Sequence, residues 1–202
     1  ITMINLPARR LLAVSITLAP STTVQAAGFA LIENSASGTG IAFAGAAAVA
    51  EDASTTWFNP AGMAELGDGI QTSVAGHIII PKAKFTDKGS WVNPALTGGN
   101  IDQAQAALTG INDDGGKAAF VPNSYVVKRF NEKITGGVGI NAPFGLETAY
   151  ESDWIGRYNA LDSAMQTVNI NPSIAYEVNE QLTFGGGVSL QYITVELGSA
   201  ID

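Results

Sequence analysis

The 202 residues are 46% hydrophobic and only 14% charged, which is about half of the roughly 25% found in typical soluble domains. The net charge of −8, which becomes −10 without the first 26 residues, argues against a nucleic-acid-binding surface. The absence of cysteine excludes disulfides and thiolate metal sites.

Residues 1–26 have the layout of a secretory signal peptide. Two arginines precede an apolar run over residues 11–19, and Val24 and Ala26 stand at the −3 and −1 positions of a cleavage site. Cleavage is therefore predicted after Ala26. The alternative is an N-terminal membrane anchor, but this apolar run is too short to cross a hydrocarbon core of about 30 Å.

The next stretch, residues 27–68, is rich in Ala, Gly, Ser and Thr and has little bulky apolar surface for a core of its own. A short Ala-rich helix is predicted over residues 41–50, and Asp52 or Ser54 is expected to cap a second turn. Asn59-Pro60-Ala61 predicts a capped helix of about two turns, because Asn favours the N-cap and Pro the first helical position. We therefore expect this stretch to pack against surfaces supplied by the rest of the chain.

From Gly69 onward, apolar residues recur at every second position, which predicts β-strands. In the third strand, Pro143 removes a backbone donor and Gly145 loosens the chain, so this strand is expected to kink or lose its pairing there. Past Tyr192 the alternation changes phase, which predicts a bulge or the rim of a barrel. The five expected strands cover residues 70–80, 121–130, 134–146, 167–178 and 182–192.

The connections alternate between three-residue turns, at residues 131–133 and 179–181, and long loops, at about 85–120 and 147–164. The first loop contains a possible helix over residues 102–108. This asymmetry is typical of outer-membrane barrels, and strands of this length suit a tilted crossing of the bilayer. A soluble barrel is the alternative. Because membrane barrels begin at about eight strands, five strands predict that the chain is part of a longer protein.

Several motifs give the chain a clear family resemblance. The N-terminal region resembles that of the FadL/TodX-type outer-membrane transporters of long-chain fatty acids and other hydrophobic compounds, and the likeness extends along residues 3–202. The motifs are Ala27-Gly-Phe29, Ser35-Ala-Ser-Gly38, Ala42-Phe-Ala-Gly45, Asp52-Ala53, Asn59-Pro60-Ala61, Val121-Pro-Asn123, Asn141-Ala-Pro-Phe-Gly-Leu146 and Val168–Val178.

The resemblance implies an all-β fold, a transmembrane antiparallel barrel of about fourteen strands. Residues 27–68 would form a helical hatch inside it, and residues 69–202 would supply its first strands. It also implies a monomer in outer-membrane lipid that carries a hydrophobic ligand passively, without a cofactor, metal or nucleotide. The ligand would be captured at extracellular loops, pass to a site beside the hatch, and leave sideways at the kinked third strand.

The same resemblance assigns roles to particular residues. Phe29 and Asn59-Pro60-Ala61 would belong to the moving hatch, and Pro143, Phe144 and Gly145 to the lateral opening. One departure concerns a carboxylate ligand, which needs an inward cation. Beyond Lys133 the only basic residue is Arg157, in a loop. Either the cation lies outside this chain or the ligand is uncharged.

Aromatic residues in the two long loops are candidates for ligand capture. Trp91, Trp154 and Tyr158 would offer an apolar landing site, and the alternative is that they anchor the barrel at the lipid interface.

Two other function classes stay open. One is a structural or adhesive barrel with a static plug. The other is a barrel lipase, which would need the only histidine, His77, as its base; a lone histidine on a strand is more often a polar lumen residue, and no nucleophile-elbow motif is present. Because the lone histidine has no such motif beside it, no catalytic residue is predicted. The spacing of the acidic residues matches no calcium loop, so no metal site is predicted either.

Overall fold

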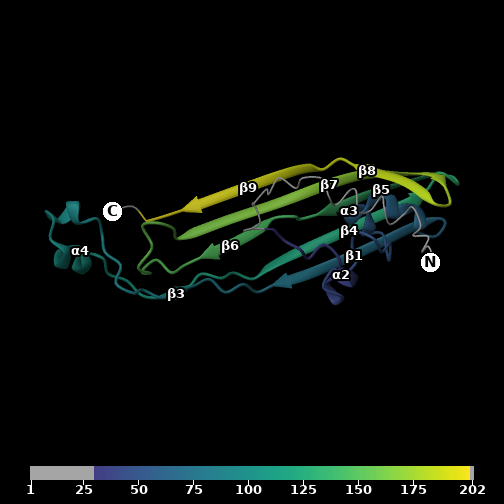
Figure 1. The fold of residues 1–202 in the computed structure, drawn as a ribbon. Helices are drawn as coiled ribbons and strands as arrows, with labels where there is room; N and C mark the ends of the chain where they lie inside the picture. The colour runs from purple at the N-terminus through teal and green to yellow at the C-terminus, as the bar shows by residue number, and fades with distance from the viewer. Residues whose placement is uncertain (1–29, 201–202) are drawn as a thin grey trace, which may run out of the picture.

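A computed structural model describes residues 30–200, so the predicted signal peptide and Phe29 lie outside the described residues. The main feature is an antiparallel sheet of seven strands in which β7 pairs with β5 and β6 along one edge and with β8 and β9 along the other (Figure 1). The strands are β1 (Ile70–Ile79), β4 (Ala119–Arg129), β5 (Ile134–Asn141), β6 (Gly145–Ala149), β7 (Asp162–Asn179), β8 (Leu182–Gly187) and β9 (Leu190–Gly198).

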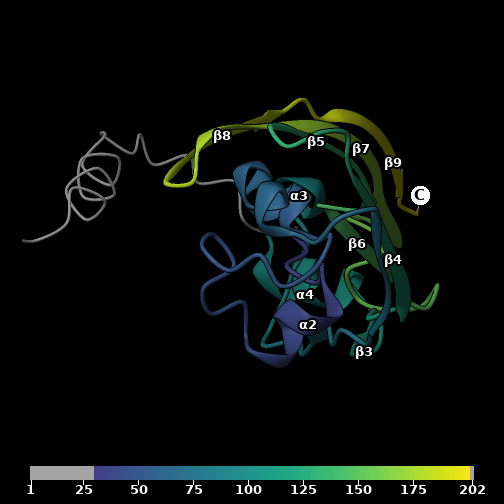
Figure 2. The same cartoon turned by 90° about the vertical axis from the view of Figure 1, so that its right-hand side faces the viewer.

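The N-terminal segment, which here means residues 30–68, lies on the concave side of the curved sheet (Figure 2). It contains two short α-helices, α2 (Ala36–Gly40) and α3 (Thr55–Phe58), and the 3₁₀ helix η1 (Pro60–Glu65). Within residues 30–200, no helix combines the length and the apolar character that crossing a membrane would require.

The predicted alternation is confirmed in the exposure of the strands. On β1, Ile70, Val74 and Ile78 point away from the concave side and are 63%, 77% and 74% exposed. On β7, by contrast, Thr167 and Asn169 face the concave side and are buried. The sheet is therefore apolar outside and largely polar inside, which is the arrangement of a membrane barrel wall.

A small core joins the N-terminal segment to the sheet. Its buried members are Ala53, Met63, Ala64, Leu66, Tyr125, Val127 and Ala175. Two inward glycines allow the close approach. A Cβ at Gly185 would lie 2.1 Å from the backbone nitrogen of Ala61, and one at Gly137 would lie 2.5 Å from Met63 Sδ. The small inward residues of the strands thus leave room for this segment.

The predicted Ala-rich helix over residues 41–50 is wrong. The helix of this region is α2, at Ala36–Gly40, and the chain after it forms turns. Ala42 and Phe43 have positive φ angles of 51° and 57°, which end any right-handed helix. Phe43 folds back, so that its ring packs against Phe58 at 5.6 Å and occupies the space that Gly38 leaves open. Tertiary packing has overridden the helix propensity of alanine.

The third predicted strand does lose its pairing where Pro143 and Gly145 suggested. β5 ends at Asn141, β6 begins at Gly145, and both pair with β7. Residues 142–144 lie opposite only two residues of β7, Thr167 and Val168, because the register shifts by one between the two ladders. This is a β-bulge, and we call residues 142–144 the wall gap.

The fifth predicted strand is also divided, but not where its pattern changes phase. β8 and β9 are separated at residues 188 and 189, opposite Pro172, which has no N–H to donate. Asn171 supplies the missing donor, since its Nδ2 lies 3.2 Å from the carbonyl oxygen of Val188. The register with β7 continues unshifted past Tyr192, so the bulge expected there is wrong.

The long connections differ in detail from the sequence expectation. The first contains β2 (Lys84–Phe85), η2 (Pro94–Thr97), α4 (Ile101–Ala107) and β3 (Asp113–Asp114), so its helix is confirmed within one residue. The second is shorter than predicted, because β6 extends to Ala149 and β7 begins at Asp162. Both connections lie at one end of the sheet, opposite the tight turns (Figure 1).

Candidate functional site

A pocket of about 530 Å³ surrounds the wall gap. Phe144 and Gly145 line it, but its other lining residues come from both faces of the sheet. Leu31, Val121, Leu146, Met165 and Thr167 belong to the concave side, whereas Phe120, Ile140 and Val168 are exposed on the convex side. The pocket therefore reaches both sides of the wall at the point where the strand pairing is interrupted.

The backbone of the wall gap finds substitute hydrogen-bond partners. The Thr167 hydroxyl accepts a hydrogen bond from Phe144 N at 3.0 Å and donates one to Phe144 O. The carbonyl oxygen of Pro143 accepts a hydrogen bond from Leu31 N at 2.9 Å, and Ala30 forms an isolated bridge with Phe144. Unpaired backbone is costly at membrane depth, so one side chain and the N-terminal segment take the place of the missing ladder.

The inner face changes its chemistry at the wall gap. On the loop side, Leu146, Met165 and Val195 form one row across β6, β7 and β9. The next inward pair is Thr167 and Ile193, and on its turn side Asn141, Asn169 and Gln191 form an amide row across β5, β7 and β9. The phase change past Tyr192 explains this, because Ile193, Val195 and Leu197 turn to the inner face without a change of register.

The start of the N-terminal segment is held by side chains of three strands. Asn141 Nδ2 donates to Asn34 Oδ1 at 2.8 Å, and Asn141 Oδ1 accepts from Asn169 Nδ2 at 2.9 Å. Tyr125 donates its hydroxyl proton to the Asn34 carbonyl oxygen at 2.8 Å. Asn123 Nδ2 donates to the carbonyl oxygen of Glu33 at 2.6 Å. The sequence patterns assign no role to Asn34, Asn169 or Thr167; for the last two, the polar residues at every second position of β7 were the available signal.

The predicted motif Asn59-Pro60-Ala61 lies elsewhere. It packs against Gly185 on β8, and none of its residues lines the pocket at the wall gap. As predicted, Asn59 takes the N-cap position and Pro60 the first helical position of η1, but the Asn59 side chain makes no capping bond to it. Instead Asn59 Nδ2 donates to the Ala47 carbonyl oxygen at 3.0 Å and ties the Ala-rich turns to η1.

Asp52 organises the middle of the N-terminal segment. Its carboxylate accepts hydrogen bonds from Ser54 N and from Ser37 Oγ, each at 2.8 Å. Partial burial raises the pKa of this carboxyl group, but the hydrogen bonds from Ser54 and Ser37 outweigh burial and hold the pKa below its usual value. Asp52 thus stays ionised and fastens α2 to the start of α3.

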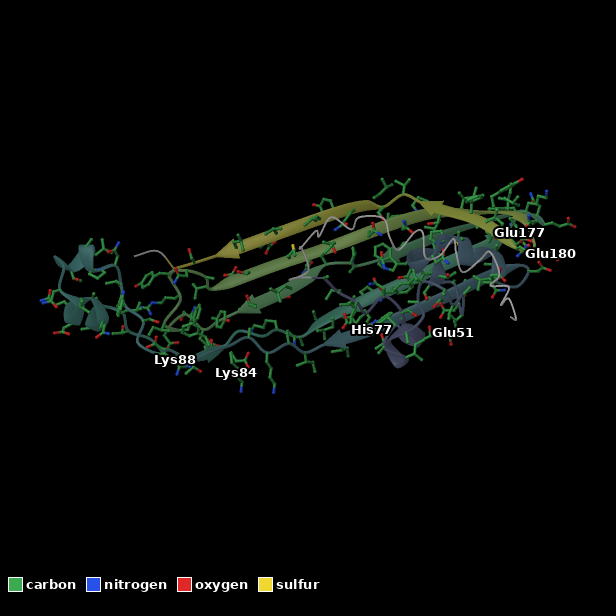
Figure 3. All side chains as sticks on the ribbon, viewed as in Figure 1. Glu51, His77, Lys84, Lys88, Glu177 and Glu180 are labelled. Atoms are coloured by element: carbon green, nitrogen blue, oxygen red, sulfur yellow. The ribbon has the colours of Figure 1, made fainter. Side chains whose placement is uncertain are left out.

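His77 comes from β1 (Figure 3), and its ring lies between Thr39 of the N-terminal segment and Asn123 of β4. Its Nε2 is 3.3 Å from Thr39 Oγ1, and its Nδ1 is 3.3 Å from Asn123 Nδ2. Neither ring nitrogen contacts a serine hydroxyl or a carboxylate in these hydrogen bonds. The ring therefore has the surroundings of a polar lumen residue.

Two of the three aromatic residues predicted for ligand capture come together. Trp91 and Trp154 line a second hollow of about 510 Å³ among the long connections. Trp154 stacks on Tyr150 at 4.0 Å and meets Phe85 edge-on at 5.4 Å. Tyr158 does not line this hollow; the Arg157 guanidinium lies over its ring at 4.6 Å.

Charge around the pocket at the wall gap is sparse. Lys117 and Glu147 are the charged side chains among its lining residues in the described part of the chain. Arg157, the one base beyond Lys133, donates to the carbonyl oxygens of Thr109 and Trp154 within the loops. Lys117 was not among the predicted cations, because it precedes Lys133 and lies in the first long connection.

Comparison with known proteins gives a consistent result. Residues 17–202 match the family described as "Outer membrane protein transport protein (OMPP1/FadL/TodX)". The chain is 32% identical over 185 residues to outer membrane protein P1 of Haemophilus influenzae, covering 85% of this chain and 37% of that protein. It is 31% identical over 186 residues to the long-chain fatty acid transport protein of Escherichia coli O6:H1, covering 92% and 38%.

A solved structure shows the same fold. The crystal structure of a Pseudomonas aeruginosa FadL homologue superposes with a TM-score of 0.66 at 21% sequence identity, covering 84% of this chain and 39% of that chain. This chain spans less than two fifths of the length of these relatives. The curved sheet is thus an arc of their barrel wall.

Proposed function

The chain belongs to the OMPP1/FadL/TodX family of outer membrane transport proteins, and from this membership we propose that it carries hydrophobic molecules passively across the bacterial outer membrane. The expected cargo is a long-chain fatty acid or a related hydrocarbon, as the name of its Escherichia coli relative indicates for that protein. The cargo is captured among the long loops, moves inward, and leaves sideways through the wall gap.

The observation that carries this proposal is the change in the inner wall at the wall gap. The apolar row Leu146–Met165–Val195 lies on the loop side of Thr167, and the amide row Asn141–Asn169–Gln191 lies on its turn side. A hydrocarbon gains about 0.8 kcal/mol for each buried CH₂ along the first row and loses that gain among amides. A ligand that leaves sideways into lipid at this level does not have to pass the amide row on the turn side of the wall gap.

The pocket at the wall gap fits such a cargo. Its volume of about 530 Å³ lies within the range of roughly 300–1,000 Å³ typical of small-molecule sites, and most of its lining residues are apolar. Lys117 at its margin would attract a carboxylate head group, whereas Glu147 would repel one. These two charges suit a ligand with one small polar end.

The N-terminal segment acts as the hatch in this proposal, with residues 27–68 forming the hatch and residues 69–202 the first part of the wall. The hatch packs on the concave side through a small core with seven buried members in residues 30–200, three of them alanine, so only a limited core has to open for it to shift. Asn59-Pro60-Ala61 belongs to the part that must shift. The aromatic hollow of Trp91 and Trp154 serves as the capture site.

Uptake of a labelled long-chain fatty acid by cells tests the route. In Gly145→Val the new side chain enters the wall gap, since a Cβ at Gly145 already comes within 3.1 Å of Leu31. Uptake should fall several-fold. Gly186→Val is the matched control, because a Cβ at Gly186 meets nothing within 4 Å. Asn59→Ala, which loses the bond to Ala47, should also slow uptake.

Each variant must first be shown to be folded in the outer membrane, by its amount there and its heat-dependent electrophoretic mobility. If Gly145→Val and Asn59→Ala are folded and take up the label at the parent rate, the lateral route is wrong and the static structural or adhesive barrel is favoured. Lipid hydrolysis that is lost in His77→Ala would instead indicate the lipase.

A further inference from the structure

We infer that Asn141 is a positioning residue that latches the start of the hatch to the wall gap, through a relay of three amides, Asn34, Asn141 and Asn169. The relay itself is a matter of geometry. Only its effect on uptake rests on the proposed function.

The relay is buried and directional. Asn141 and Asn169 are 2% and 0% exposed, and Asn34 is 4% exposed. The amide of Asn169 donates to Asn141, Asn141 donates to Asn34, and Asn34 donates to the Leu31 carbonyl oxygen at 2.9 Å. Each amide thereby fixes the orientation of the next, from β7 through β5 to the N-terminal segment. A buried chain of this kind is costly to break at any member, because partners are left unpaired.

The middle of the relay and its end at Leu31 both adjoin the wall gap. Asn141 is the last residue of β5 and directly precedes residues 142–144. Leu31, at the other end, donates its N–H to the Pro143 carbonyl oxygen inside the gap and lines the pocket with its side chain. The same few residues therefore hold the hatch against the wall and complete the backbone hydrogen bonds of the gap.

This arrangement makes hatch and gap move together. If residues 30–34 leave the wall, the Asn34–Asn141 bond and the Leu31–Pro143 bond are lost in the same step, and the gap loses one of its substitute partners. If the relay stays intact, Leu31 remains across the gap. The state in which Leu31 lies across the gap is thus stabilised by side-chain amides of the wall as well as by packing of the hatch.

A thiol reporter tests the latch without any transport. The chain contains no cysteine, so Leu31→Cys introduces a single thiol at the gap. In outer membranes, its rate of reaction with a maleimide should rise about tenfold on adding Asn141→Ala, a factor that corresponds to the net worth of about one hydrogen bond. Asn34→Ala should accelerate it at least as much, and Asn34→Ala with Asn141→Ala no more than Asn34→Ala alone.

Asn171→Ala is the matched control. Asn171 is a buried amide on the same face of β7, and its hydrogen bonds go to Val188, Ser189 and Ser173 of the wall. Its loss should weaken the wall without changing the labelling rate. All variants are compared at equal amounts of heat-modifiable, folded protein.

The outcomes separate the latch from the proposed function. Faster labelling in Asn141→Ala together with faster uptake of a fluorescent fatty acid supports both. Faster labelling with unchanged uptake upholds the latch and overturns the exit route. Equal labelling rates in Asn141→Ala and Asn171→Ala overturn the latch, whatever the uptake.

Discussion

Thr167 makes two hydrogen bonds to the backbone of the wall gap. Its hydroxyl accepts from Phe144 N and donates to Phe144 O, so a single group satisfies both backbone atoms of a residue that has left the ladder. Thr167 itself is buried on the inner face of β7. Both backbone groups would otherwise face an apolar pocket or lipid, where an unpaired group costs more than in water.

Thr167→Val keeps the shape of this side chain and removes both bonds. We expect the free energy of unfolding in detergent micelles to fall by about 1–3 kcal/mol, the usual cost of leaving buried backbone groups unpaired. Thermal or denaturant unfolding followed by circular dichroism measures the change. Thr194→Val is the control, because Thr194 lies opposite Gln166 on the exposed face of β9. Equal losses in the two variants would contradict the role given to Thr167.

At the scale of elements, glycine residues let the N-terminal segment pack closely against the sheet. Gly185 on β8 faces η1, and a Cβ there would lie 2.1 Å from Ala61 N and 2.5 Å from Ala61 Cα. These are backbone atoms, so no side-chain rotation can relieve the clash. Gly185, together with Gly137 beneath Met63, therefore forms a docking surface for η1.

Gly185→Ala should consequently push Pro60 and Ala61 away from the wall. We expect a loss of about 1–3 kcal/mol in unfolding free energy, the usual range for overpacking, and faster proteolytic cleavage within residues 41–68. Gly186→Ala, one residue along the same strand, points into open space and should change neither quantity. A Gly185→Ala protein as stable and as protease-resistant as Gly186→Ala would show that η1 is not docked there.

The strands were predictable because their signal is local. Alternation and a proline with a nearby glycine are read directly from neighbouring residues, so the ladder break at Pro143 was expected before the structure. The turns after α2 were not, because they depend on Phe43 reaching Phe58 and Gly38. The Asn59 side chain likewise bonds to Ala47, a partner that its capping preference does not reveal.

The candidate site was predictable only in its wall component. Pro143 and Gly145 were predictable from backbone chemistry and Phe144 from the family resemblance, but the partners that fill the wall gap come from Leu31 and Thr167, which are far from it in sequence. Tyr192 shows the limit of the pattern itself. The change of phase after this residue suggested a bulge. The register is in fact unbroken, and the inner-facing positions of β9 become apolar from Ile193 onward. Alternation reports which residues are apolar, and pairing decides which face they occupy.

At the scale of the whole molecule, the two ends of the sheet carry different kinds of connection. The two tight turns lie at one end and the long connections at the other, with Glu177 and Glu180 at the first end and Lys84 and Lys88 toward the second (Figure 3). Barrels of the outer membrane place short turns in the periplasm and long loops outside the cell. The hollow of Trp91 and Trp154, which we propose as the capture site, then faces the medium, and the wall gap lies between it and the tight turns.

This orientation predicts which introduced thiols are accessible in intact cells. Lys88→Cys, in the first long connection, should react with a membrane-impermeant maleimide added to the medium, because that connection projects beyond the lipid. Glu180→Cys, in a tight turn, should react only after the outer membrane is permeabilised. The cysteine-free parent gives the background. Labelling of Glu180→Cys in intact cells with protection of Lys88→Cys would invert the barrel, and the capture hollow would then face the periplasm.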